Sequence, residues 1–382
     1  MIPAQRDKPR TARRVSWDVL RVVAIGCVLL HHATLTSLVD HPDLGPPPFV
    51  FSMSMGASTL MVVSAFFACA TLDSGRPGRF LWRRLARLLP AYMAAVLLTY
   101  AVQRWIAPEG WSQLTGRDVL YNLLLIHQWF KDVKIVDFAY WTVPVQITAF
   151  IAAAVLAKYL RGRKLQVFLW ALILTPLVLR EFLDYSHTLK TLYDGFTVHR
   201  GQLFAAGIAI WLWHKRRMSA PHLAALLVAT LMAQAIHTTE YGSTLGFGVL
   251  LLLVCAAAAG PDWVFFQPIA KPISWLAGIS YGVYLVHQGI GTVVMDRMHA
   301  VGLRSWWLLA GFVANALVLG WLMTKFVERP AYRLLTQIHS GSSGSSPRRP
   351  EPSVLPVSQP RTALADPLTE LRLAGPLTVQ MR

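Results

Sequence analysis

The chain has 382 residues, of which 54% are hydrophobic and only 14% are charged, and its mean hydropathy is +0.45. Soluble globular chains carry about 25% charged residues, so this composition excludes a soluble globular protein and indicates a polytopic helical membrane protein. The formal net charge is +17. Because the basic residues lie in short segments between apolar blocks, we expect membrane lipids, and not nucleic acid, as partners.

We expect an all-α fold, a transmembrane helical bundle of about ten spans. A spanning helix needs about 20 predominantly apolar residues, and stretches of this kind recur along the chain. They cover residues 17–38, 49–71, 84–105, 139–160, 165–183, 198–214, 219–237, 242–259, 272–296 and 305–327.

Lysine and arginine are distributed unequally between the two sides of this ten-span arrangement. They gather in the N-terminal segment and in the loops that follow spans two, four and six, whereas the loops on the other side hold few. Cytoplasmic loops of membrane proteins carry the excess of basic residues. We therefore expect a multi-pass protein of the cell membrane with both termini in the cytoplasm.

We expect the chain to divide into three segments. Residues 1–16 form a basic cytoplasmic N-terminal segment, and residues 17–333 form the transmembrane domain. Residues 340–382 are rich in Gly, Ser and Pro without apolar periodicity, and we expect a disordered cytoplasmic tail there. Within the domain, 106–138 is apolar only over a short stretch, so we expect an interfacial or re-entrant segment. Were it a span, every later loop would change sides.

The first span carries ionisable residues into the membrane on one face. Arg21 and His32 are 11 residues apart; at roughly 100° per residue they point the same way, about 16 Å apart along the axis. His31 is rotated about 80° from that face. Ionisable residues inside a spanning helix are costly and usually belong to a functional site. No CxxC or HExxH pattern accompanies them, and we predict no metal site.

Four motifs occur in order along the chain. The first is the Arg21-x10-His32 pair, the second is RRLARLLPAY at 83–92, the third is SYGVYLVHQ at 280–288, and the fourth is VERP at 327–330. Together they resemble the membrane acyltransferase-3 family, bacterial integral-membrane enzymes that transfer acyl groups from acyl-CoA to sugars, envelope glycans, lipids or antibiotics. The resemblance covers about residues 16 to 333.

Two motifs depart from that family's usual pattern. Residues 64–66 read Ser-Ala-Phe where the family often has Ser-Gly-Phe, and residues 141–146 read Trp-Thr-Val-Pro-Val-Gln where it often has a final glutamate. The amide of Gln146 keeps hydrogen bonding but is neither an anion nor a base. A catalytically inactive relative is therefore one alternative.

The resemblance implies an O-acyltransferase whose co-substrate is acyl-CoA, expected to be acetyl-CoA, with no bound cofactor. His32 would be the general base, since a buried imidazole stays neutral and accepts a proton from an attacking hydroxyl. Arg21 and His31 are further catalytic candidates. Arg21 also belongs to the expected CoA-phosphate site, together with Arg83, Arg84 and Arg87. Positive-inside topology alone would also explain these arginines.

The acceptor is expected to be a hydroxyl of a sugar, an envelope glycan, a lipid or a glycosylated metabolite. Trp141 and Gln146 at the outer start of span four, and Tyr284 and His287 in span nine, are the candidate acceptor-binding residues. An interfacial belt residue and polar helix contacts are the structural alternatives for these positions.

A second alternative is a membrane transporter or flippase for a polar lipid or metabolite, which would explain buried charge without a reaction. It predicts two pseudo-symmetric halves with broken helices at matching positions. The sequence contains no convincing internal repeat, although Pro144 and Pro176 are possible helix breaks.

Overall fold

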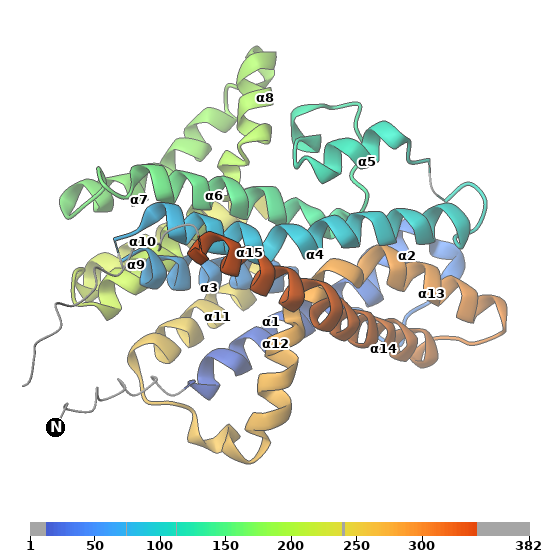
Figure 1. Ribbon diagram of the computed structural model, residues 1–382. Helices are drawn as coiled ribbons and strands as arrows, with labels where there is room; N and C mark the ends of the chain where they lie inside the picture. The colour runs from blue at the N-terminus through green and yellow to red at the C-terminus, as the bar shows by residue number, and fades with distance from the viewer. Residues whose placement is uncertain (1–12, 74, 112, 239–240, 342–382) are drawn as a thin grey trace, which may run out of the picture. The chain divides into compact units, whose positions relative to one another are not determined.

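The protein is described by a computed structural model, which places residues 13–73, 75–111, 113–238 and 241–341. Most of the basic N-terminal segment and nearly all of the predicted tail lie outside these described residues. All regular elements among the described residues are helices, and no strand occurs there (Figure 1). The expected all-α bundle is therefore confirmed.

Eight helical segments are long and apolar enough to cross a membrane, which confirms a multi-pass membrane protein. The helices at their centres are α1 (Val15–His31), α3 (Met55–Leu72), α4 (Pro77–Trp105), α6 (Thr142–Leu156), α10 (Ala220–Thr238), α11 (Tyr241–Ala259), α12 (Ala270–Val286) and α14 (Trp306–Met323). The shorter helices are α2 (Ser37–Asp40), α5 (Gly116–Leu123), α8 (His187–Gly195), α13 (Gln288–Ala300) and α15 (Arg329–Gly341).

Two of the ten expected spans correspond to shorter or more charged helices, α7 (Arg163–Arg180) and α9 (Gly201–His214), which are not among these eight. Fourteen residues of α9 extend about 21 Å, less than the roughly 30 Å hydrocarbon core. Helix α9 is nevertheless deeply buried, and a Cβ atom on Gly207 would lie 2.4 Å from the Val62 carbonyl oxygen of α3. A short helix is tolerated here because its neighbours, and not lipid, surround it.

Contacts between loops agree with the expected order of crossings. Arg217, after α9, forms an ion pair of 3.3 Å with Asp73, after α3, and the ten-span arrangement places both on its basic side. On the opposite side, the Arg297 guanidinium at the end of α13 donates to the Ile106 carbonyl at the end of α4, 3.0 Å away. Each contact joins two loops that the sequence assigns to the same side.

The described part of the connection 106–138 contains no candidate span, as expected. It holds α5, whose first turn is closed by a Thr115–Asp118 capping box, and a short 3-10 helix, η3 (His127–Trp129). The Trp129 ring packs against Phe196, just after α8, with centroids 4.8 Å apart. Helices α5 and α8 therefore belong to the same face of the bundle, at the top of Figure 1.

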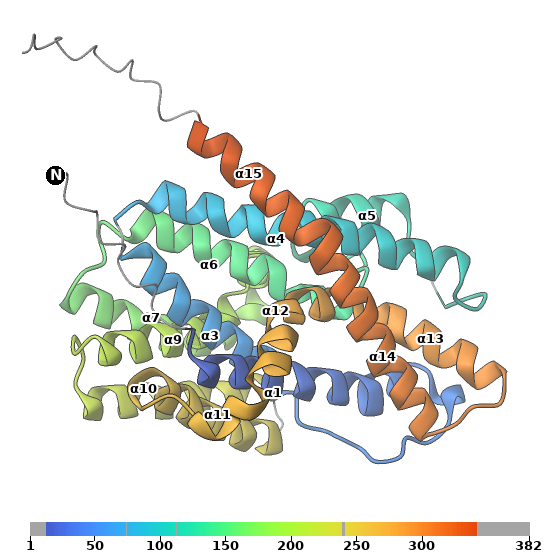
Figure 2. The same ribbon diagram turned by 60° about the horizontal axis from the view of Figure 1, so that its bottom comes forward.

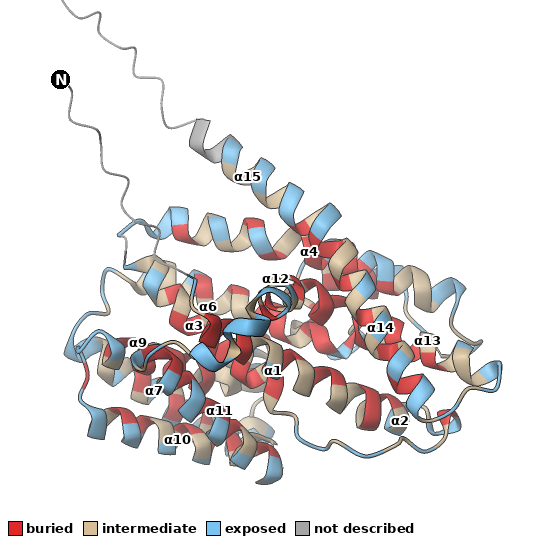
Figure 3. Cartoon of the chain, turned by 90° about the horizontal axis from the view of Figure 1, so that it is seen from below, coloured by how far each residue is buried: buried red, intermediate tan, exposed pale blue. Residues whose placement is uncertain are grey.

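Packing of α1, α12 and α14 forms the centre of the half that carries the late motif (Figure 2). Helices α12 and α14 approach at two glycines, since a Cβ on Gly282 would lie 2.4 Å from the Gly320 carbonyl oxygen. Small residues permit this close approach in membrane bundles. Figure 3 shows buried residues on the facing sides of the helices and exposed ones outside; Leu245 and Leu252 on the outer side of α11 are 74% and 67% exposed.

The predicted single span 272–296 is wrong in one respect, because the helix bends at His287 between α12 and α13. A helix start leaves backbone N–H groups without intrahelical acceptors. The carboxylate of Asp137 accepts the Gly289 N–H at 2.8 Å and the Ala139 N–H at 2.9 Å. Asp137 therefore stabilises both the bend and the 3-10 helix η4 (Phe138–Trp141) that leads into α6.

We predict that reporter fusions after residues 78, 162 and 216 all read cytoplasmic, because these loops carry the excess of basic residues. A fusion after residue 110 should read external and serves as the matched control. An external signal after residue 162 would contradict the ten-crossing order. It would also make 118–130 a true span.

Candidate functional site

Two histidines from distant parts of the sequence, one partly and one fully buried, meet where their helices are irregular. His32 begins a π-helical turn, η1 (His32–Thr36), that continues α1, and π-turns inside α-helices are frequent at functional sites. His287 lies at the bend between α12 and α13 and is fully buried. Their ring centroids are 5.0 Å apart. We call His32 and His287 the histidine pair.

The histidine pair has ring nitrogens available for chemistry. Nδ1 of His287 lies 2.7 Å from the Tyr284 carbonyl oxygen, which fixes this nitrogen as the N–H donor and leaves Nε2 as an acceptor. Nε2 of His287 and Nδ1 of His32 are both buried without a hydrogen-bond partner among the described residues. The Gln288 side chain interacts with the His32 ring. Unsatisfied buried polar atoms of this kind need an explanation, and a substrate is one.

His31 has a different environment from His32. Its ring lies 5.5 Å from the His32 ring, centroid to centroid, and its Nδ1 is 3.2 Å from the Phe51 carbonyl oxygen. That contact ties the end of α1 to the loop before α3. The three rings are not arranged as a metal site, since no group of three or more His, Cys, Asp or Glu side chains within the described ranges is placed to hold a metal ion.

Arg21 is held near the other end of α1 by a buried carboxylate. Asp18, which is fully buried, lies 3.2 Å from the Arg21 guanidinium. Asp18 also accepts from Arg13 at 2.6 Å and from the Ser274 hydroxyl at 2.8 Å. The Arg21 guanidinium carbon lies 5.0 Å from the Phe67 ring centroid. Asp18 thereby joins the start of α1 to α12 and orients Arg21.

The arginines of α4 are divided by the structure. Arg84 and Arg87 lie within electrostatic range of Arg21 and of each other, and we call these three the arginine group. Arg84 also stacks on Phe150, with 5.2 Å from guanidinium carbon to ring centroid. Arg83 and Arg87 are both exposed and share a helical face by sequence spacing, but of these two only Arg87 forms an ion pair with a described carboxylate, that of Glu328.

Glu328 of the VERP motif forms an ion pair at the edge of the arginine group. Its carboxylate lies 3.5 Å from Arg87 and accepts from the Thr324 hydroxyl at 3.3 Å inside a second π-helical turn, η8 (Thr324–Glu328). The motif therefore connects α14 to α4 at the same end of the bundle as Arg21.

Predicted acceptor-binding residues lie at the opposite end of the polar interior. Tyr284 donates to the Ala139 carbonyl at 2.9 Å and its ring is 5.6 Å from His287. Trp141 carries the Arg200 guanidinium over its ring at 4.4 Å. Tyr284 and Arg200 interact electrostatically, so a continuous set of side chains leads from Trp141 to the histidine pair.

The two motifs that depart from the family pattern contact each other through Ser64 and Gln146. The Ser64 hydroxyl of α3 donates to the Gln146 Oε1 of α6 at 3.1 Å. A glutamate would accept the same hydrogen bond, so the substitution keeps the contact and removes the charge. Gln146 is thus engaged with α3 and is not in the group that surrounds His287.

Sequence reasoning missed Asp137 and His127, which lie in the connection before α6. Burial raises the pKa of Asp137 to about 6, although two backbone N–H bonds oppose the shift. Burial lowers the pKa of His127 to about 4, and neither of its ring nitrogens has a partner among the described residues. The position of Asp137 directly before an apolar span was the available signal, since Asp is a favoured helix-cap residue.

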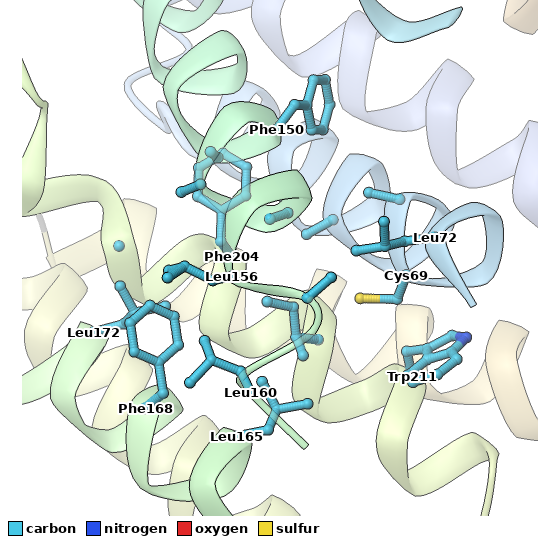
Figure 4. Close-up of a pocket in the computed structure, with 18 of the residues that line it drawn as sticks. Cys69, Leu72, Phe150, Leu156, Leu160, Leu165, Phe168, Leu172, Phe204 and Trp211 are labelled. Atoms are coloured by element: carbon cyan, nitrogen blue, oxygen red, sulfur yellow. The ribbon is translucent and has the colours of Figure 1, made fainter. Parts of the chain in front are cut away.

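The helix bundle also contains a large cavity. Its volume is about 1200 Å³, and side chains of α3, α6, α7 and α9 line it (Figure 4). Ala65 of the Ser-Ala-Phe motif and Arg200 belong to its wall, whereas His32 and His287 do not.

A family model described as an acyltransferase domain matches residues 14–325. The protein belongs to the acyltransferase-3 family. The match includes the histidine pair and the arginine group, and it ends just before Glu328. Neither the curated proteins nor the solved structures yielded a match to this chain.

We predict that Asp137→Ala lowers the thermal unfolding temperature of this acyltransferase-3 protein. Loss of the carboxylate leaves the N–H groups of Ala139 and Gly289 without their acceptor, and each such loss costs about 1–3 kcal/mol. Asp132→Ala is the control, because this residue forms only an exposed ion pair with Arg117, worth about 0–1 kcal/mol. Equal stability of the two variants would contradict the assignment of Asp137 as the support of the bend.

Proposed function

We propose that the protein is an integral-membrane O-acyltransferase that moves an acyl group from acyl-CoA to a hydroxyl of a sugar, envelope glycan, lipid or glycosylated metabolite. The observation that carries this proposal is the histidine pair: two imidazoles at helix irregularities, each with a buried and unpartnered nitrogen. Membership of the family supports the reaction class.

His32 is the general base of the proposed reaction. Its imidazole takes the proton of the acceptor hydroxyl while that oxygen attacks the thioester carbonyl carbon. The tetrahedral intermediate collapses with cleavage of the C–S bond, and the imidazolium returns the proton to the leaving CoA sulfur. The products are the acyl ester and free CoA, and no oxidant or reductant takes part. His287, whose Nδ1 faces the Tyr284 carbonyl, is a positioning residue beside the His32 ring.

The arginine group is the proposed dock for the CoA phosphates. Guanidinium groups bind phosphate through charge-assisted, often bidentate hydrogen bonds. Arg21 lies on the His32 face of α1, about 16 Å from His32 along the axis, so a bound CoA can extend its pantetheine arm toward the histidine pair. With both termini in the cytoplasm, this dock faces the compartment that supplies CoA esters, expected to be acetyl-CoA.

The acceptor is proposed to approach from the Trp141 side. Tyr284 lies beside His287 and Trp141 stacks with Arg200, so these side chains would meet an acceptor that enters from that end, whereas Gln146 holds α6 against α3 through Ser64. An aromatic ring with nearby hydroxyl and imidazole groups suits a sugar, whose ring has one apolar face and several hydroxyls.

We predict that His32→Ala abolishes most acyl transfer while acyl-CoA binding persists. Loss of a positioned general base typically costs about 10²–10⁴ in rate. Acylated product and binding of a CoA analogue would be measured on the same detergent-purified samples. His31→Ala is the matched control, because its ring contacts the Phe51 carbonyl, and it should cost much less.

Near-normal transfer by His32→Ala would overturn the mechanism. If the wild-type protein releases no CoA from acyl-CoA with any hydroxyl acceptor but moves a labelled lipid or sugar across vesicles, the transporter alternative is correct.

A second prediction concerns the donor. Replacing Arg84 and Arg87 together by Gln should raise the apparent KM for acyl-CoA by tenfold or more, since hydrogen bonds to charged groups are worth about 1.5–3 kcal/mol each. The KM for the acceptor should change little. Arg83→Gln is the control, because Arg83 forms no ion pair with a described carboxylate, whereas Arg87 lies 3.5 Å from Glu328. If Arg83→Gln raised the KM as much as the double replacement, the arginines would act only as a diffuse positive surface.

A further inference from the structure

The cavity bounded by α3, α6, α7 and α9 is long and mostly apolar, and its wall does not include the histidine pair. Apolar side chains make up most of its wall, among them Leu72, Leu156, Phe168 and Phe204 (Figure 4). Along α7 it extends from Leu165 to Pro176, a rise of about 17 Å. One leaflet of a bilayer contributes about 15 Å of hydrocarbon, so the length suits one extended alkyl chain.

One end of this cavity holds a cation that lacks an anionic partner. Arg200 lines the cavity, and its Nε is buried without a hydrogen-bond partner among the described residues. Its guanidinium stacks on Trp141. The charged or titratable groups that act on it are Tyr284 and Tyr193, and within the described part of the chain no carboxylate pairs with it. Among the described residues, therefore, no carboxylate offsets this positive charge next to the apolar space.

Two histidines beside Arg200 have free nitrogens as well. His199 Nδ1 and His237 Nε2 are buried and unpartnered among the described residues, and their ring centroids are 6.2 Å apart. We call His199, Arg200 and His237 the Arg200 cluster. The backbone before it is strained, since Thr197 has φ +51°, a conformation that β-branched residues rarely adopt. Strain of this kind persists where the surrounding structure requires it, often at binding sites.

The opposite end of the cavity is basic too, but its cations differ. Arg217 pairs with Asp73 at 3.3 Å and its side chain is 55% exposed. Arg161 is exposed and follows α6 in the predicted basic loop. Solvent and an existing ion pair satisfy these groups, so the Arg200 end is where a ligand anion has most to gain.

We propose that this cavity binds a single-chain amphiphilic anion. Its phosphate or carboxylate head lies at the Arg200 cluster, and its apolar chain runs between α6, α7 and α9. Arg200 lines the cavity and supplies the charge, whereas His199 and His237 lie next to it and are not part of the cavity wall. The cavity does not include the histidine pair, although Arg200 adjoins the proposed acceptor residue Trp141, and the test of this site needs no acyl donor.

The test uses calorimetry on the detergent-purified full chain with three probes: hexadecyl phosphate, hexadecanol and inorganic phosphate. Hexadecyl phosphate should bind at least tenfold more tightly than either of the others, because only it has both the chain and the charge. Arg200→Gln should weaken the binding of hexadecyl phosphate at least tenfold, as expected for a lost hydrogen bond to a charged group. It should leave the affinity for hexadecanol unchanged. Ala149→Phe, which narrows the cavity, should weaken the binding of both amphiphiles.

Arg161→Gln at the opposite end is the matched control and should leave all affinities unchanged. Equal binding of hexadecanol and hexadecyl phosphate by the wild-type protein would overturn the proposal, because it removes the anion site. Inorganic phosphate binding as tightly as hexadecyl phosphate would overturn the role of the cavity. If Arg161→Gln lowered the affinity for hexadecyl phosphate as much as Arg200→Gln does, the head group would not be specific to the Arg200 end, and the proposed placement would be wrong. If Arg200→Gln does not fold, Arg200→Lys should bind hexadecyl phosphate more weakly than wild type, with hexadecanol unchanged.

Discussion

The hydrogen bonds that Asp137 accepts from Gly289 and Ala139 support the arrangement on which the candidate site depends. A transmembrane helix satisfies its own backbone groups, and any break leaves some of them unpaired in an apolar medium. Asp137 fills that need at the start of α13, so α12 can end at Val286 and His287 can leave the regular helix. The bend brings the His287 ring next to His32. Each ring then has a buried nitrogen without a hydrogen-bond partner among the described residues.

The arginines around the histidine pair lie toward two opposite ends of the helix bundle. Arg21, Arg84 and Arg87 lie toward the basic end, where Asp18 and Glu328 hold two of them in place. Arg200 lies toward the other end over Trp141. For the proposed reaction and the proposed amphiphile site, the anionic donor and the acceptor or amphiphile would therefore approach from opposite ends without competing for the same cations. Between these ends, neutral polar groups such as Ser64 and Gln146 join the helices without adding charge.

Much of the fold could be predicted from the sequence because the membrane imposes a length and a polarity on each helix. The Arg21–His32 spacing placed both residues on one face of α1, and short loops with clustered arginines placed the crossings in order. Helix α9 was less predictable. Its fourteen residues are too few to cross alone, and only the surrounding helices, with the α3 backbone packed against Gly207, make such a short helix stable in the bundle.

The sequence by itself determined the class of the protein, the order of its helices and the residues of its motifs, since hydropathy and charge act locally along the chain. The tertiary structure alone decided which of those residues meet. It joined His32 to His287 across about 255 positions, paired Arg87 with Glu328, and gave Asp137 and Arg200 roles that their neighbours in sequence do not suggest. These pairings depend on helix rotation and on one helix bend, which side-chain packing between distant segments fixes.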